Sequence, residues 1–582
     1  MRNRSPILKD ERAFQHYSRL IVLGIKQDLL VSLGEVAEVL CTTPRHCRTL
    51  LQSLQQREWL NWTPKSGRNQ RSILHLNFSP NEIQTSRARL LIEKGNYENA
   101  LELLEGDQNQ FSSLLQQTSG ALIREGQLHI QLTYQRIFSQ LLPHKPLRNS
   151  ERFLVRQVYA CLTACDRNGV VKPQLAHHWQ QSADATKWRF YIRPQLRFHS
   201  NSLIDAELIC DLFTNLCVLP EYEKELAHVR NISASHQCVT FELSTSDQGF
   251  AALLSDLRYS IQPARQIGNA SGINVDGCGP FRMVEQSDKR VRLQAFDHYF
   301  STRSLTDSVT IWQFDHTPSE RIQFGRTNTD NPHQIIESHT SEAASTQTRI
   351  ENGCLYLVFN MNNGQTPLTH AQRKYLSKTL SPELVLQEEG LSELLLASIP
   401  AHSLLPDWTK VRPQAAEETS LPAQLDIAVY DHLVILDCAR VLSDKLNQMG
   451  VESRVNVYSF SELHERAQRN ELSEGLVIAS LITDDNLPIS MFRWFCSNSI
   501  LHQGLPDEAK HWINAELAVL RGQYEAGDYL KILESLATTM LYENWIAPLF
   551  HHRQTLKWLG VLQGVSMTDW SWPDFKNVWT DD

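Results

Sequence analysis

Five side chains that can bind nucleic acid lie within eight residues of one another: Arg45, His46, Arg48, Thr49 and Gln52. Such side chains donate hydrogen bonds to phosphates and to base edges. The apolar residues among them recur at intervals of 3, 1 and 3, which is one face of a helix: Cys47, Leu50, Leu51 and Leu54. The spacing therefore predicts a helix whose polar side enters the major groove of duplex DNA.

The residues before this segment are suited to position it. Val36, Ala37 and Leu40 form the apolar stripe of a preceding short helix, and a turn follows at residues 41–43. Thr43 is the expected N-cap and a further candidate DNA contact, and Pro44 suits the first helical position. Two helices joined in this way predict a helix-turn-helix, although an αα-hairpin inside a larger core would show the same pattern.

A basic hairpin is expected next. Trp59–Trp62 and Arg71–Leu76 have the composition of strands, and the loop Thr63–Gln70 between them includes Gly67. The candidate phosphate contacts of this wing are Lys65, Arg68 and Arg71. The wing favours a winged helix-turn-helix, residues 1–78, over a hairpin buried in a core.

Positive charge is confined to this part of the chain. Residues 1–90 contain 14 Lys and Arg against 7 Asp and Glu, a net charge of +7, whereas the whole chain carries −9. The remaining residues therefore carry −16. Because an acidic surface repels DNA, only the N-terminal module is expected to contact double-stranded DNA.

Composition and motifs limit the other possibilities. With 582 residues, 41% of them hydrophobic, the chain can form several globular domains. Neither a secretory signal nor a membrane span is expected, which predicts a cytoplasmic protein. The 11 scattered cysteines are expected to be reduced thiols, and Cys47 is expected in the core.

Motifs for an enzyme are missing from the sequence, which contains no G-x-x-x-x-G-K-[ST], H-E-x-x-H or G-x-S-x-G. We therefore predict no catalytic residues, no cofactor and no metal site. The paired histidines at 177–178 and 551–552 point apart on a helix or a strand. Asp484-Asp485 is expected in a solvated loop, with a bound cation as the alternative.

Residues 81–126 are predicted to be helical. Two helices meeting at Gly95-Asn96 resemble half of a tetratricopeptide hairpin, and a single copy cannot bury a repeat core. We expect residues 79–127 to connect the DNA module to the rest of the chain, and a partner-binding surface is the alternative.

From about Leu128 the sequence resembles the family 5 extracytoplasmic solute-binding proteins, which bind oligopeptides and dipeptides. The resemblance rests on the order of short segments, with Pro367 and Arg373 placed as in that family: Arg152–Asp166, Pro173–Trp179, Trp188–His199, Gly277–Phe281, Leu293–Phe300 and Tyr356–Asn360. The family's small turn after a Phe-His pair is Ser200-Asn201 here, so peptide specificity is not carried over.

This resemblance implies a two-lobed α/β domain over residues 128–582, with lobe 1 at about 128–357 and 546–582 and lobe 2 at about 358–545. The crossings are expected near Val358–Asn362 and Ala547–His551, and a small-molecule ligand is expected between the lobes. Our candidate ligand contacts are Asn360, Arg373, Trp494 and His551. Arg373 suits an anionic ligand, but it could equally fix its own helix, and Trp494 could be a core residue.

Taken together, the DNA module and the solute-binding body resemble the SgrR family of bacterial transcriptional regulators. The most specific segments are Pro44–Leu51, Gly67–Ser72, Leu175–Gln181 and Ser571–Trp579. The resemblance implies activation of a small regulatory RNA gene and repression of the regulator's own gene when sugar phosphates accumulate. The alternative is a cytoplasmic solute-binding or chaperone-like protein whose winged helix docks protein.

Overall fold

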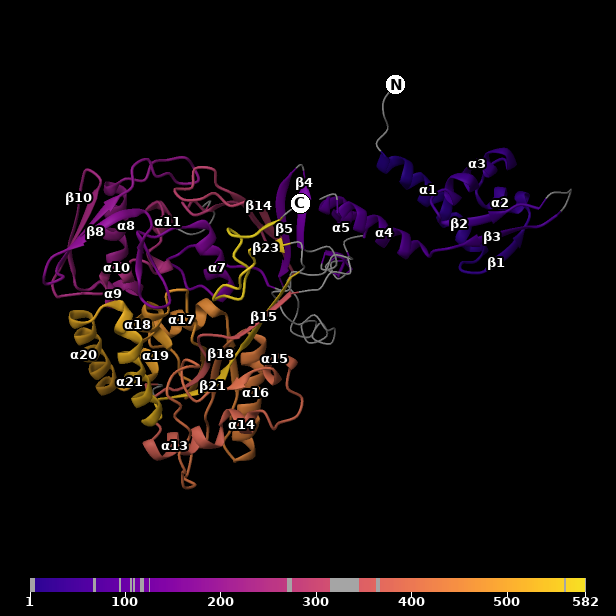
Figure 1. Ribbon diagram of the computed structural model, residues 1–582. Helices are drawn as coiled ribbons and strands as arrows, with labels where there is room; N and C mark the ends of the chain where they lie inside the picture. The colour runs from indigo at the N-terminus through magenta and orange to yellow at the C-terminus, as the bar shows by residue number, and fades with distance from the viewer. Residues whose placement is uncertain are drawn as a thin grey trace. The chain divides into compact units, whose positions relative to one another are not determined.

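The chain divides into two compact units, 1–118 and 119–582, which we describe separately (Figure 1). The computed structural model describes residues 6–65, 70–93, 96–104, 107, 110–111, 113–115, 120–124, 126–134, 136–268, 275–314, 345–362, 367–558 and 562–580. Within these ranges, no helix is long and apolar enough to cross a membrane.

The first unit contains the predicted winged helix-turn-helix. Its elements are α1 (Pro6–Leu20), η1 (Ile21–Leu23), β1 (Asp28–Val31), α2 (Leu33–Val39), α3 (Pro44–Gln55), β2 (Leu60–Thr63) and β3 (Ser72–Leu76). The strands form an antiparallel sheet in the order β1-β3-β2. The Thr43 hydroxyl accepts the His46 N–H at the start of α3, as the sequence predicts. Ser32 and Glu35 cap α2 reciprocally.

The connector helices begin on this unit. α4 (Pro80–Glu93) and α5 (Tyr97–Leu103) lie on either side of the predicted junction at Gly95-Asn96. Gly95 itself lies outside the described residues. Ile83 of α4 is buried in the same core as Tyr17, Cys47 and Leu51. The hydrophobic core of the DNA module therefore extends beyond residue 78.

One part of the predicted helical connector is wrong. Residues Gly120–Arg124 form strand β4, which pairs antiparallel with β5 (Gln127–Tyr134). Gly126 in the intervening turn has a φ of +76°, a backbone conformation that glycine adopts without strain. The turn and the pairing with β5 outweigh the helical tendency of this segment.

The first lobe of the second unit comprises the described residues of 120–350 and 553–580. Its two larger sheets have the strand orders β12-β13-β14-β5-β4 and β10-β11-β9-β8. Its strands are β6 (Thr163–Cys165), β7 (Val171–Pro173), β8 (Ala176–Gln181), β9 (Lys187–Ile192), β10 (Val229–Ser235), β11 (Cys238–Leu243), β12 (Phe281–Gln286), β13 (Arg290–Ala295) and β14 (Thr306–Gln313). Its helices are α7 (Asn149–Val158), α8 (Ala206–Cys217), η2 (Pro220–Tyr222), α9 (Glu223–Leu226), α10 (Phe250–Leu253), η3 (Leu257–Tyr259) and α11 (Arg265–Gly268).

Two glycines of the segment Gly277–Phe281 hold α7 close to this lobe. A Cβ atom added at Gly277 would lie 2.1 Å from the Val158 carbonyl oxygen, and one at Gly279 would lie 2.6 Å from the Val158 carbonyl carbon. The Gly279 N–H donates to the Val158 carbonyl at 2.8 Å. Only glycine permits this approach, which fixes the end of the helix that carries Arg152 and Arg156.

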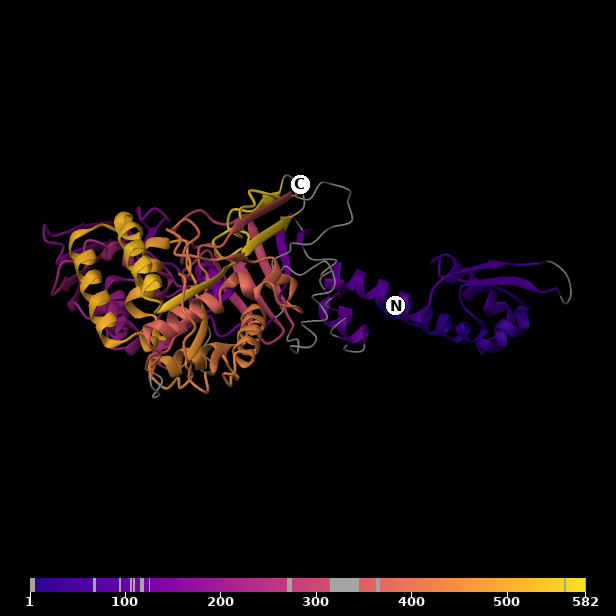
Figure 2. The same ribbon diagram turned by 90° about the horizontal axis from the view of Figure 1, so that it is seen from below.

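The second lobe, residues 355–551, is built on a mixed six-stranded sheet, β17-β21-β16-β20-β18-β19. Its strands are β16 (Leu355–Phe359), β17 (Ile399–Pro400), β18 (Ile427–Tyr430), β19 (Val455–Tyr458), β20 (Leu476–Ser480) and β21 (Ile546–His551). Its helices are α13 (His370–Thr379), α14 (Pro382–Val385), α15 (Glu393–Leu396), α16 (Leu433–Gln448), α17 (Phe460–Gln468), α18 (Leu487–Ser497), α19 (Ser499–Gly504), α20 (Asp507–Gln523), η4 (Ala526–Asp528) and α21 (Tyr529–Tyr542). Helices α18, α20 and α21 pack together on one side of this lobe (Figures 1 and 2).

The connections between the lobes differ by a few residues from those we expected. β16 is buried throughout and pairs with β20 and β21, so Val358 and Ala547 lie inside the sheet of the second lobe. The chain crosses instead between β15 (Ser345–Ile350) and β16, and between β21 and β22 (Arg553–Trp558), with β15 and β22 paired antiparallel. After β22, the pair β23 (Leu562–Gln563) and β24 (Trp579–Thr580) and a set of buried aromatic residues complete the core of the first lobe.

Candidate DNA-binding surface and interlobe site

The outer face of α3 displays the predicted DNA contacts. Arg45, His46, Arg48, Thr49 and Gln52 are all exposed, whereas Cys47, Leu51 and Leu54 are buried in the core of the unit. The capped start of the helix fixes the orientation of this face. Thr43 is exposed as well, but its hydroxyl is used as the N-cap, so its contact with DNA remains a prediction.

The wing is described only in part. Lys65 is exposed, and its backbone N–H donates to the Ser72 hydroxyl at 3.2 Å, which joins the two sides of the hairpin. Arg71 lies 3.3 Å from the Glu35 carboxylate, and both side chains are largely exposed. Such an exposed pair is weak and leaves the guanidinium available to a phosphate. Gly67 and Arg68 lie outside the described residues.

The predicted ligand contacts in the second lobe have structural partners. The Asn360 amide donates to the carbonyls of Leu472 and Glu474 at 3.0 and 2.9 Å. Arg373 donates to three carbonyls, those of Leu368, Glu543 and Asn544. Arg373 therefore fixes its own helix to the start of β21, which is the alternative considered from the sequence.

The other two candidates are also buried. The Trp494 indole donates to the Tyr356 hydroxyl at 3.2 Å, and a ring nitrogen of His551 lies 2.6 Å from the Gly353 carbonyl. Burial lowers the pKa of His551, so this ring is neutral at pH 7. The four candidates bond to separate sets of residues, and their contact with a ligand stays a prediction.

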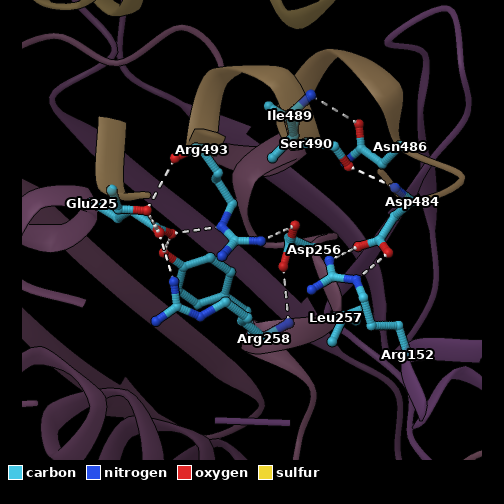
Figure 3. A network of polar contacts seen from close by, with 12 residues as sticks. Arg152, Glu225, Asp256, Leu257, Arg258, Asp484, Asn486, Ile489, Ser490 and Arg493 are labelled. Carbon is cyan, nitrogen blue, oxygen red and sulfur yellow. Dashed lines mark hydrogen bonds and ion pairs between the residues drawn. The ribbon is translucent and has the colours of Figure 1, made fainter. Parts of the chain in front are cut away.

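A buried ion network joins the two lobes, and the sequence analysis did not predict it (Figure 3). Arg493 on α18 of the second lobe donates to Glu225 at 3.0 Å and to Asp256 at 2.6 Å, both in the first lobe. Glu225 also accepts from Arg258 at 2.8 Å, from the Tyr259 hydroxyl and from Ser497. Both carboxylates are fully buried.

The positive neighbours keep these carboxylates ionised. Burial acts to raise the pKa of Asp256, but the charges of Arg493 and Arg152 lower it to about 2. The same competition, with Arg493 and Arg258 as the cations, leaves the pKa of Glu225 below its ordinary value. The network is therefore held as charged pairs at neutral pH, and it depends on Arg493.

A second part of the network corrects the expectation for Asp484-Asp485. Arg152 on α7 forms a bidentate ion pair with Asp484, which also accepts from the Trp570 indole at 3.2 Å. Arg156 bonds Asp485 at 3.0 Å. Asp484 is only 1% exposed, because an aspartate with a guanidinium partner can be buried where a free one cannot. Both ion pairs link the lobes, and the solvated loop that we expected is wrong for Asp484, whereas the Asp485 side chain is 47% exposed.

We call these eight residues the interlobe ion network: Arg152, Arg156, Glu225, Asp256, Arg258, Asp484, Asp485 and Arg493. Four guanidinium groups face four carboxylates, so the charges balance within the network. Among the described residues, no group of three or more His, Cys, Asp or Glu could hold a metal ion. The arrangement can hold the lobes together, and an anion entering it must compete with the carboxylates for arginine.

Glu351 provides a pH-dependent contact where the chain crosses between the lobes. Its backbone N–H donates to the His552 carbonyl at 2.9 Å, and its side chain accepts from Asn149 at 3.2 Å. Burial raises the pKa of Glu351 to about 7. Its contribution to stability is therefore complete below about pH 4.5, the pKa of an ordinary glutamate, and is lost as the pH rises through about 7.

We accordingly expect Glu351→Gln to be more stable than the unmodified chain at pH 8 and about equally stable at pH 5, because glutamine cannot ionise. Urea unfolding at the two pH values measures this difference. Glu417→Gln, at an exposed position outside the helices and strands, serves as the control. A stability difference that is the same at both pH values would contradict a raised pKa.

Comparisons with known proteins match both parts of the chain. Residues 12–126 match the family model "Sugar transport-related sRNA regulator N-term", and residues 170–374 match "Bacterial extracellular solute-binding proteins, family 5 Middle". The HTH-type transcriptional regulator SgrR of Salmonella typhi is 29% identical over 569 residues, which covers 96% of each chain. SgrR of Yersinia enterocolitica is 28% identical over 560 residues, 94% of this chain and 95% of the relative.

Solved structures share the fold of the second unit. AgaA from A. tumefacien R10, in complex with agropinic acid, is 13% identical with a TM-score of 0.61, and the match covers 78% of this chain and 99% of AgaA. The oligopeptide-binding protein AppA from Bacillus subtilis, in complex with a nonapeptide, is 14% identical with a TM-score of 0.60. This match covers 78% of this chain and 100% of AppA. These likenesses confirm the predicted two-lobed solute-binding fold.

Proposed function

The chain belongs to the SgrR family of HTH-type transcriptional regulators, and on that premise we propose that it is a DNA-binding regulator controlled by a small molecule bound between the lobes. The observation that carries the proposal is the exposed face of α3, which presents two arginines, a histidine, a threonine and a glutamine on a capped helix beside a basic wing. These side chains and this position suit base readout in the major groove.

The regulated genes in this proposal are a small regulatory RNA gene, which the protein activates, and its own gene, which it represses. The signal is the accumulation of sugar phosphates. The name of the N-terminal family model, which refers to sugar transport, supports this assignment.

The primary test is a gel shift of the full chain on the DNA upstream of its own gene, at two salt concentrations. We expect a specific complex that weakens steeply with salt, because phosphate contacts release counterions. Equal and weak binding to unrelated DNA would favour the alternative, in which the winged helix docks protein.

A separate prediction concerns the wing. Arg68→Ala and Arg71→Ala should each weaken binding to all DNA sequences similarly, and each should reduce the slope of log affinity against log salt by roughly one. The physical reason is that phosphate contacts carry charge without sequence information. A changed sequence preference at an unchanged salt slope would show that the wing binds bases instead.

A further inference from the structure

Helix α1 carries a second basic face beside the recognition helix. Arg12, His16 and Arg19 recur at intervals of four and three, so they share one side of α1. The adjoining side packs into the core through Tyr17 and Leu20. Arg12 and Arg19 are exposed, and His16 is half-buried.

This face lies next to the start of α3. α1 packs directly against α3, and Arg19 donates to the Leu40 carbonyl at 3.3 Å, at the end of α2. Burial lowers the pKa of His16, and the neighbouring groups Arg19, His46 and Arg12 lower it further.

Its positive charge is uncompensated. Within the described part of the chain, neither Arg12 nor Arg19 forms an ion pair with a carboxylate, in contrast to Arg71 and Lys26, which pair with Glu35 and Glu82. One ring nitrogen of His16 is buried without a hydrogen-bond partner among these residues. An anion beside this face would meet two arginines that form no ion pair with any carboxylate among the described residues.

We propose that α1 is a second DNA-contacting helix, in which Arg12 and Arg19 bind backbone phosphates next to the groove that α3 occupies. The proposal rests on the proposed DNA-binding function and extends the interface beyond α3 and the wing. A polyanion suits this face because its two exposed arginines lie on a helix that packs against α3, and duplex DNA presents phosphates continuously along its length. These contacts fix the position of the duplex and carry no base preference.

The test is the salt dependence of DNA binding by the full chain on the DNA upstream of its own gene. Arg12→Ala and Arg19→Ala should each reduce the salt slope by about 0.9, and the double variant by about twice that, at an unchanged sequence preference. Because Arg19 also bonds a backbone carbonyl, Arg19→Lys separates charge from structure and should keep the slope. Lys26→Ala removes one charge from the segment between η1 and β1, outside α1, α3 and the wing, and it should bind like the unmodified chain.

The possible outcomes separate this proposal from the function on which it rests. If the full chain binds specifically and Arg48→Ala weakens binding, but both α1 variants keep the original slope and affinity, the role of α1 is refuted and the proposed function stands. If the α1 variants instead change the oligomeric state at an unchanged salt slope, this face docks a second copy and the proposal is also refuted. If no variant and no unmodified chain binds DNA, the proposed function itself fails.

Discussion

Arg493→Met is expected to lower the free energy of unfolding by about 3–5 kcal/mol, because it leaves two buried carboxylates without their shared cation. Glu225 and Asp256 are fully buried, and Arg493 reaches both from the other lobe. Once Arg493 is absent, burial raises the pKa of each carboxyl, so the deficit should be larger at pH 8 than at pH 5. Urea unfolding of the full chain at the two pH values measures the effect.

Two further variants identify the cause. Arg440→Met removes an exposed guanidinium that lies 3.9 Å from Asp437, and it should change stability by less than about 0.5 kcal/mol. Combining Arg493→Met with Asp256→Asn removes the carboxylate that loses its ion-pair partner and should recover much of the loss, while Glu225 keeps its ion pair with Arg258. If Arg493→Met is no more harmful than Arg440→Met, the network does not stabilise the closed lobes.

Arg48→Ala is expected to produce the largest loss of DNA affinity. A bidentate contact between arginine and a base contributes about 1–3 kcal/mol of discrimination, which corresponds to binding that is roughly 5- to 150-fold weaker. The loss should be greatest on the preferred sequence and small on unrelated DNA. Fluorescence anisotropy with both DNAs measures this difference, and Lys26→Ala is the charge-matched control. Wild-type affinity on several promoter fragments would refute the placement of α3 in the groove.

The DNA-binding surface could be predicted because its signals are local. The Thr43 cap, Pro44 and the apolar spacing of α3 lie within twelve residues, and local hydrogen bonds and packing determine their conformation. The basic face of α1 was missed, although the spacing of Arg12, His16 and Arg19 is visible in the sequence. Its significance depends on the packing of α1 against α3, which the sequence does not reveal.

The interlobe ion network could not be predicted for a related reason. Arg493 lies 268 residues from Glu225 and 237 from Asp256, so no spacing rule connects them. Conversely, Asn360 suggested a ligand site because it lies at the expected first crossing, and Arg373 because a guanidinium suits an anionic ligand. Both bond backbone carbonyls, which is the commonest role of a buried polar side chain, and their contact with a ligand stays a prediction.

Control of the DNA-binding unit by the ligand-binding unit is the central claim of this account. Ligand and DNA must then affect each other's affinity by the same factor, typically 5- to 150-fold. Glu225, Asp256 and Asp484 already occupy the arginines of the network, so an anionic ligand that competes for them would alter the contacts that hold the lobes together.

The most direct test is isothermal titration of a hexose 6-phosphate into the full chain, alone and saturated with the DNA upstream of its own gene. The unphosphorylated hexose and inorganic phosphate are the controls for the two halves of the ligand. We expect the affinity for the hexose 6-phosphate to differ between the two states by the factor that this ligand imposes on DNA binding. Measurable binding of the sugar phosphate with identical affinity in both states would contradict ligand control of DNA binding.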